Sequence, residues 1–304
     1  MATLKRISIS GHPFLVEGFK SGGTANVYFL KPEIPSPYQF TPAARTLRIY
    51  EGELAVKVPR DGSVAEEFAA ECRSWMELKH KSFVPLLKVT KLNSAYAALM
   101  PRYESDLAAH ILSPHSYSEI SEGLVTLVEA LHWAWNDLGV LHLDLKPENI
   151  LIDRSPTGSL FSVSDWGMAK INEKMFRAKR HISEGVKVQA GSLGGTLPYM
   201  SPRRINDLLS GNDNPHFDVT DDVFSFGIIL AELCLQQRVW SIYGTEDERS
   251  LFNLVSTHRY HNKLEKKLAM SRSPLVSLAI SCCSPAPSMR PNYIQIQGML
   301  KDVV

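Results

Sequence analysis

Short apolar segments dominate residues 1–100 and predict a strand-rich region. Their branched, aromatic and aliphatic residues are typical of strands, and they cover residues 14–19, 25–30, 54–58, 86–92 and 96–100. A single helix is predicted among them, because Ser63 and Glu66 form a capping-box pattern and apolar residues then recur at helical spacing. Those apolar positions are Phe68, Cys72, Trp75 and Met76. The proline-containing stretch 31–52 predicts a long loop or insertion.

The remainder of the chain predicts helices. Ser116 and Glu119 form a second capping-box pattern, and one apolar face then continues until Gly139 ends the helix. That face comprises Ile120, Leu124, Leu127, Val128, Leu131, Trp135 and Leu138. Residues 224–235 are apolar nearly all round, which indicates a buried helix. We therefore expect an α+β fold whose two parts meet around residues 101–104 and form a cleft.

Composition and charge exclude several classes of protein. The 304 residues are 44% hydrophobic, enough for one or two cores, and the net charge of +1 gives no electrostatic basis for nucleic-acid binding. No continuous apolar segment is long enough for a signal peptide core or a membrane span. The four cysteines lack metal-site spacing and predict reduced thiols. We expect a soluble, cytoplasmic protein.

The chemistry is concentrated in residues 141–149, Leu-His-Leu-Asp-Leu-Lys-Pro-Glu-Asn, and in Asp165-Trp166-Gly167. Phosphoryl transfer needs a carboxylate to orient the attacking hydroxyl, a cation beside the transferred group and oxygen ligands for Mg²⁺. The first run resembles the catalytic loop H-R-D-L-K-P-E-N of eukaryotic-type protein kinases, and the second resembles their D-F-G motif. The resemblance extends over residues 14–296 and implies a bilobal kinase fold, with a small strand-rich lobe and a larger helical lobe.

The resemblance also implies roles for the polar residues. Asp144 would accept or orient the proton of the substrate hydroxyl, and Lys146 would steady the γ-phosphoryl group. Asn149 and Asp165 would hold Mg²⁺. Residues 195–202 resemble the substrate-receiving segment G-T-x-x-Y-M-A-P of the serine/threonine branch, so Thr196 should hydrogen-bond near Asp144 and Lys146.

A nucleotide site is implied in the first part of the chain. Lys57 resembles the strand lysine that contacts the α- and β-phosphates, and Glu71 is its expected partner, in competition with Glu66, Glu67 and Glu77. Residues 20–27 resemble a glycine-rich phosphate loop in which Lys20 and Ala25 replace two motif glycines. The expected ATP-binding residues are Gly22, Gly23, Val27, Ala55, Lys57, Met100, Arg102 and Leu151, with Met100 at the back of the adenine and Arg102 in the hinge 101–103.

Three residues depart from the family pattern, and Asp222 follows it. Leu143 replaces an arginine that binds activation-segment phosphate in many kinases, and Trp166 replaces a phenylalanine. Arg203 stands where a glutamate normally pairs with the arginine here numbered Arg290, so Arg203 should separate from it or recruit an acid such as Asp207 or Asp218. Asp222 should anchor the backbone of the catalytic loop.

The sequence therefore predicts a single protein kinase domain over residues 1–304, with lobes at 1–100 and 105–304 and a hinge at 101–104. It would use ATP and Mg²⁺ to phosphorylate serine or threonine of protein substrates. A pseudokinase that binds nucleotide or protein as a scaffold is the alternative, suggested by the altered glycine loop and Arg203. A small-molecule phosphotransferase, which would share the H-x-D motif, is less favoured because of the substrate-receiving segment.

Overall fold

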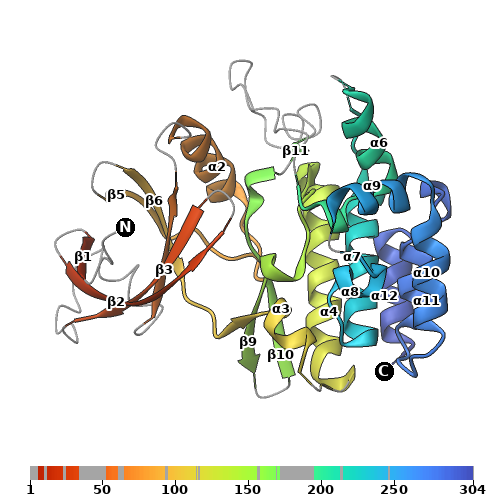
Figure 1. Ribbon diagram of the computed structural model, residues 1–304. Helices are drawn as coiled ribbons and strands as arrows, with labels where there is room; N and C mark the ends of the chain where they lie inside the picture. The colour runs from red at the N-terminus through yellow and green to blue at the C-terminus, as the bar shows by residue number, and fades with distance from the viewer. Residues whose placement is uncertain are drawn as a thin grey trace. The chain divides into compact units, whose positions relative to one another are not determined.

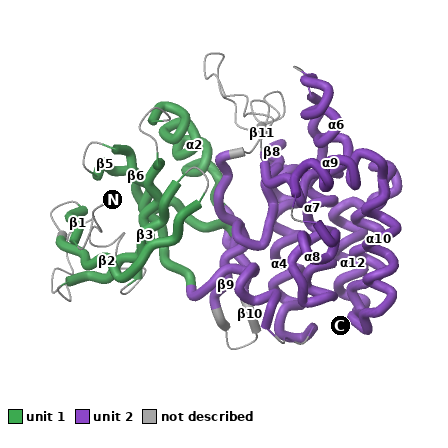
Figure 2. The backbone as a smooth tube through the Cα atoms, in the orientation of Figure 1, with its two compact units in different colours: residues 1–79, 83–103 green, residues 80–82, 104–304 purple. Residues whose placement is uncertain are grey.

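The chain forms two compact units, Met1–Lys79 with Phe83–Tyr103 and His80–Ser82 with Glu104–Val304 (Figure 2). The computed structural model describes residues 6–9, 12–22, 25–33, 53–60, 65–92, 95–113, 115, 117–155, 158–168, 170–171, 195–212, 215–245 and 247–303. The boundary between Tyr103 and Glu104 falls within the segment where the sequence predicts a change from strands to helices.

The first unit is built on an antiparallel six-stranded sheet with strand order β1-β2-β3-β4-β6-β5 (Figure 1). The strands are β1 (Arg6–Ile9), β2 (His12–Ser21), β3 (Ala25–Pro32), β4 (Leu54–Pro59), β5 (Lys88–Leu92) and β6 (Ala95–Pro101). A register shift between Val16 and Gly18 bends β2 against β3. The register pairs Val27 with Lys57 and Ala55 with Met100. Expected nucleotide-binding residues therefore share neighbouring strands.

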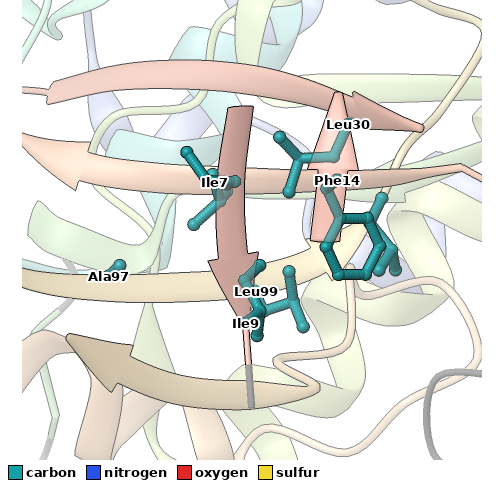
Figure 3. Close-up of a cluster of buried hydrophobic side chains, with 8 residues drawn as sticks. Ile7, Ile9, Phe14, Leu30, Ala97 and Leu99 are labelled. Atoms are coloured by element: carbon teal, nitrogen blue, oxygen red, sulfur yellow. The ribbon is translucent and has the colours of Figure 1, made fainter. Parts of the chain in front are cut away.

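One face of this sheet carries a core of aliphatic and aromatic side chains. Ile7, Phe14, Leu30 and Leu99 contribute to it from four different strands (Figure 3). Helix α2 (Ala65–Glu77) also packs against β6 and buries Phe68, Cys72 and Trp75, as its helical spacing predicts. The fourth position, Met76, is 44% exposed.

Helices dominate the second unit (Figure 1). Those that the structure describes are α3 (Leu107–Ile111), α4 (Tyr117–Trp133), α6 (Pro202–Ser210), α7 (Val219–Leu235), α8 (Val239–Tyr243), α9 (Glu248–Ser256), α10 (Arg259–Leu268), α11 (Val276–Cys282) and α12 (Tyr293–Lys301). Every residue of 221–233 in α7 is buried, which confirms the predicted core helix. Its Gly227 lets α11 approach closely, since a Cβ there would lie 2.7 Å from Cys282 and Cys283 atoms.

Helix α4 leads directly into the loop that carries the chemical motif. Its predicted apolar face is buried except for Trp135, which is partly exposed, and a π-helical turn at Ala134–Leu138 extends the helix to Gly139. Gly139 has a positive φ of 67° and ends the helix as predicted, because glycine adopts this backbone conformation without a steric penalty. The chain then enters β8 (Val140–Leu141) and residues 142–149.

The structure corrects the strand predictions in several places. Strand β1 was not predicted, and β5 begins two residues later than the predicted segment 86–92. The second unit is mainly helical, as predicted, and also contains short strands that were not predicted. They are β7 (Ser105–Asp106), β8, β9 (Ile150–Ser155), β10 (Gly158–Val163) and β11 (Lys170–Ile171). Strands β9 and β10 are stabilised by antiparallel pairing with each other.

Several predictions fall outside the described residues. They concern the loop at 34–52, Gly23 and the capping residues Ser63 and Ser116. The α+β fold class is confirmed by the strand-rich and helix-rich units. Within the described part of the chain, every helix is too short or too polar to traverse a lipid bilayer.

Candidate active site

In the first unit, a buried ion pair joins strand β4 to helix α2. Nζ of Lys57 donates to Oε1 of Glu71 at 2.8 Å, and the two side chains are only 8% and 14% exposed. The ring of Phe68 lies 6.0 Å from the ammonium. The structure therefore brings together the predicted pair and selects Glu71 from the four acids. A charge held this deeply in apolar surroundings needs such a partner.

The turn between β2 and β3 is closed by its own hydrogen bonds. The amide N–H of Gly22 donates to the carbonyl of Ala25 at 2.9 Å, and the Ser21 hydroxyl donates to Asn26 Oδ1 at 3.0 Å. Nη1 of Arg60, which follows β4, donates to the Gly22 carbonyl at 3.1 Å. These contacts fix the base of the predicted phosphate loop.

The remaining expected nucleotide-binding residues of this unit have different surroundings. Ala55 and Met100 are paired and buried. The Arg102 side chain binds Glu17 at 2.8 Å and lies over Phe29, while its backbone N–H donates to the carbonyl of Glu53. The Arg102 guanidinium therefore contacts residues of its own unit.

In the second unit, a closed set of hydrogen bonds surrounds Asp144. Nζ of Lys146 donates to Asp144 Oδ2 at 2.9 Å and to the Thr196 hydroxyl at 2.6 Å. That hydroxyl in turn donates to Asp144 Oδ1 at 2.7 Å. Thr196 therefore bonds to both residues, as the sequence predicts. A carboxylate, an ammonium and a hydroxyl from two distant segments meet at one point.

Asn149 completes the surroundings of Asp144. Its amide nitrogen donates to the Asp144 carbonyl at 2.9 Å and to Asp144 Oδ2 at 3.2 Å. The Asn149 carbonyl accepts from the backbone N–H of Ser164 at 2.8 Å and from its hydroxyl at 3.1 Å. Asp165 follows Ser164 directly in the sequence. The hydrogen bonds between Ser164 and Asn149 therefore connect the backbone segments that carry the two expected metal ligands, Asn149 and Asp165. Asp165 has a positive φ of 61°, an uncommon conformation outside glycine.

Asp222 of α7 anchors the backbone of the loop formed by residues 142–149. Its two carboxylate oxygens accept from the N–H groups of His142, at 2.8 Å, and Leu143, at 2.7 Å. Complete burial raises the pKa of Asp222 above its ordinary value, against the lowering effect of these donors. The predicted anchoring role of Asp222 is confirmed.

Leu143 adopts a left-handed conformation that its side chain disfavours. Its φ is 62° and it is only 2% exposed. Such a conformation costs about 1–3 kcal/mol and persists only where surrounding contacts impose it. Asp222 holds the N–H of Leu143, and Nη1 of the buried Arg204 donates to its carbonyl at 2.6 Å. The backbone that presents Asp144 is therefore fixed from both sides.

Sequence reasoning missed Arg204, which lies in α6. Burial lowers the pKa of the Arg204 guanidinium, while Asp221, Asp222 and Asp144 act in the opposite direction. The available signal was the doubled arginine after Pro202, but nothing in a local pattern distinguishes a buried arginine from an exposed one. Its contact with Leu143 joins positions 61 residues apart in the chain.

Aromatic and polar contacts position the second motif. The rings of His142 and Trp166 lie 4.7 Å apart, and Trp166 is 2% exposed. His142 Nδ1 accepts from the Asp144 N–H at 3.3 Å, so its Nε2 carries the proton that is donated to the Ser164 carbonyl. Leu151, the last expected nucleotide-binding residue, lies on β9 opposite Asp106.

Arg203 has recruited acids, as predicted for a residue that replaces a glutamate. Its guanidinium donates to Asp218 at 2.6 Å and to Asp221 at 2.5 Å. Burial acts to lower the pKa of Arg203, but these two carboxylates outweigh it and raise the pKa. Arg290 donates instead to the carbonyls of Ser284 and Thr220 and lies over Phe224. The alternative partner Asp207 bonds to Asn212.

Comparison with known proteins gives a consistent result. A profile described as the protein kinase domain matches residues 50–300. An L-type lectin-domain containing receptor kinase VI.2 from Arabidopsis thaliana is 30% identical to this chain in the matched region. The match covers 59% of this chain and 25% of the length of that relative. Human receptor-interacting serine/threonine-protein kinase 1 is 27% identical over 76% of this chain and 34% of its own.

A third similar protein is the dual specificity mitogen-activated protein kinase kinase mek-1 from Caenorhabditis elegans. It is 28% identical over 56% of this chain and 41% of its own length. The matched region is thus less than half of each of these relatives.

Proposed function

Because the chain belongs to the protein kinase family, we propose that it transfers the γ-phosphate of ATP to serine or threonine of protein substrates. The observation that carries this proposal is the closed set of hydrogen bonds among Asp144, Lys146 and Thr196. It supplies an acceptor for a hydroxyl proton beside a cation, which are the groups that phosphoryl transfer requires.

In the proposed reaction, Asp144 orients the substrate hydroxyl and accepts its proton. Asp144 is 9% exposed, and its carboxylate accepts hydrogen bonds from Lys146, Thr196 and Asn149. A substrate hydroxyl would take the place that the Thr196 hydroxyl now holds on Oδ1 or share it. Lys146 would hold the negative charge of the transferred phosphoryl group, since its ammonium is already 2.9 Å from Asp144.

The nucleotide would be bound by residues of the first unit together with Leu151. Lys57, held by Glu71, would contact the α- and β-phosphates, and the backbone around Gly22 would approach them from the turn. In the first unit, Val27 and Ala55 would contact the adenine, with Met100 behind it. Leu151 is the proposed adenine-binding residue of the second unit. Gly23 and Arg102 complete the proposed set, Arg102 through its place in the hinge.

Asn149 and Asp165 have the oxygen donors that Mg²⁺ requires. The Asn149 amide nitrogen donates to Asp144, so the amide oxygen is the atom that would bind the metal. When bound, Mg²⁺ would neutralise phosphate charge. Within the protein, the hydrogen bond from the Ser164 hydroxyl would help to position Asn149. The left-handed backbone of Asp165 would orient the Asp165 carboxylate.

Serine/threonine specificity is supported by the contact between Lys146 and Thr196. It joins the loop to the segment that resembles the substrate-receiving strand of that branch. We further propose that residues 1–304 form one kinase domain, with lobes at 1–100 and 105–304 and a hinge at 101–104. We also propose a cytoplasmic location for this protein.

The test is transfer of label from γ-labelled ATP to a serine/threonine peptide library in the presence of Mg²⁺. The expected result is peptide labelling by the wild-type protein and none by a folded Asp144→Asn variant. Equal labelling by both proteins would contradict the role of Asp144. Nucleotide binding without any transfer would favour the scaffold function, and labelling of a small hydroxylated metabolite alone would favour a small-molecule phosphotransferase.

A further inference from the structure

Three side chains of the second unit converge on Arg238, which follows α7. Its Nη2 donates to Glu148 Oε1 at 2.6 Å and to the Tyr199 hydroxyl at 3.0 Å. Its Nε donates to Glu232 Oε1 at 3.0 Å. We call Arg238, Glu148, Tyr199 and Glu232 the Arg238 cluster. One cation thus joins two carboxylates from segments that lie far apart in the sequence.

The two carboxylates of the cluster have different surroundings. Glu232 is fully buried and also accepts from the Tyr199 hydroxyl at 2.9 Å and the Val239 N–H at 2.6 Å. Burial raises the pKa of Glu232 to about 7 even with these donors. The Glu148 side chain is 34% exposed and has Arg238 as its partner. Its second oxygen, Oε2, is buried and has no hydrogen-bond donor among the described residues. The Glu148 side chain is therefore the more exposed of the two, although its unpartnered oxygen is itself buried.

The cluster borders the groups proposed to handle the substrate hydroxyl. Glu148 lies in the same loop as Asp144, in the short 3-10 helix Pro147–Asn149. Tyr199 lies in the 3-10 helix Leu197–Tyr199, immediately after Thr196, whose hydroxyl contacts Asp144. A peptide that presents its hydroxyl to Asp144 would therefore place neighbouring residues near Glu148. A free carboxylate at that position would attract an arginine or lysine of the peptide.

We propose that Arg238 is a specificity-determining residue that neutralises Glu148 from within the chain, so that the protein does not select basic residues beside the phosphoacceptor. This inference rests on the proposed function. The guanidinium already occupies Glu148 Oε1 and is held in place by Glu232 and Tyr199, so a substrate cation would have to displace Arg238 to bind Glu148. The substrate class is thus serine or threonine in a neutral or apolar sequence context.

The experiment compares pairs of synthetic peptides that differ only in arginine or citrulline, its neutral isostere, at each position flanking the phosphoacceptor. Both kcat/KM and equilibrium binding by fluorescence polarisation are measured. For the wild-type protein, the arginine-to-citrulline ratio should stay within about twofold at every position. In Arg238→Gln the ratio should rise about tenfold at one or more positions, because Glu148 loses its partner.

Three further variants identify the cause. The double variant, which carries both Arg238→Gln and Glu148→Gln, should have the same arginine-to-citrulline ratio as the wild type. Arg272→Gln removes an arginine at an exposed position and should leave the ratio unchanged. Glu148→Gln alone should also leave it unchanged, and this variant does not disturb the buried Glu232. It therefore tests the proposal even if Arg238→Gln fails to fold.

Two results would overturn the inference. One is a wild-type protein that already prefers arginine about tenfold and loses this preference in Glu148→Gln. The other is a folded Arg238→Gln protein whose ratio equals that of the wild type. Failure of the proposed function is a separate result: the wild-type protein would then label no peptide at all. The binding ratios would still decide whether Arg238 neutralises Glu148.

Discussion

Lys57 and Glu71 form an ion pair with their charged atoms 2.8 Å apart, although one lies on strand β4 and the other on helix α2. Lys57→Met should abolish phosphoryl transfer, because methionine fills a similar volume but has no charge for the nucleotide phosphates. It should also lower the free energy of unfolding by about 1–3 kcal/mol, since the buried Glu71 carboxylate loses a partner. Initial rates and urea unfolding measure the two effects.

The matched control for this change is Lys31→Met. Lys31 is also on a strand of the same sheet, but its side chain is 60% exposed and lies 3.6 Å from Glu17. This control should change neither the rate nor the stability by much, as expected for a surface pair. Transfer at the wild-type rate by folded Lys57→Met protein would exclude the proposed phosphate contact.

The hydroxyl of Thr196 leads to a second prediction, because it connects Asp144 to Lys146. Thr196→Val should reduce kcat about 10-fold or more, while Asp144→Asn should reduce it about 10²–10⁴-fold. Thr196→Ser retains the hydroxyl and should remain near the wild-type rate. Thr126→Val is the matched control, since the Thr126 hydroxyl bonds only to the Gly123 carbonyl of its own helix. A serine variant as impaired as the valine variant would show that the hydroxyl alone does not account for the role of Thr196.

The motif residues were predictable because the sequence places them in one short loop and its neighbours. Asp144, Lys146 and Asn149 occupy a single run, and the helical phase of α2 puts Glu71 on the face that carries Phe68 and Trp75. Long-range polar contacts were less accessible. Arg204 and Arg238 find their partners 61 and 90 residues away, and no local pattern encodes such a pairing. Strand β1 was missed for a related reason, since its four residues are stabilised by pairing with β2.

Metal dependence gives a third prediction, with binding as the measurement. If Asn149 and Asp165 hold Mg²⁺, ATP should raise the melting temperature of the wild-type protein strongly in the presence of Mg²⁺ and weakly in excess chelator. A ligand present at 100 times its Kd stabilises a protein by about 2.7 kcal/mol. Asp165→Ala should lose most of the difference between the two conditions. Asp137→Asn changes an acid at the end of the π-helical turn after α4, and should behave as the wild type.

An equal thermal shift with and without chelator would contradict the proposed ligand role. If the same protein also showed no transfer on addition of Mg²⁺, the scaffold function would be the better explanation. The two measurements together separate an active kinase from a protein that only binds nucleotide. Each requires only the intact chain and the Asp165→Ala variant.

Arg203 provides the last prediction, which concerns stability and its dependence on pH. Asp221 is fully buried, and Arg203 contacts both it and Asp218. Arg203→Met should lower the free energy of unfolding at pH 7 by about 3–5 kcal/mol, as expected when one partner of a buried ion pair is removed. Arg203→Glu should be worse, because it adds a third carboxylate to the same place. Arg272→Met, at an exposed position, should have little effect.

The pH dependence follows from Asp218. Burial acts to raise the pKa of Asp218, but Arg203 and Thr220 outweigh it and lower the pKa below the ordinary value of 3.8. A carboxyl group with a lowered pKa stabilises the folded state above its unfolded pKa, and this contribution is lost as the pH falls through the folded pKa. The stability difference between wild type and Arg203→Met should therefore be largest near neutral pH and shrink below about pH 4. Urea unfolding of both proteins between pH 7 and about pH 2 measures it. A difference that stays constant over this range would show that Arg203 stabilises the fold by packing and not through the charge of Asp218.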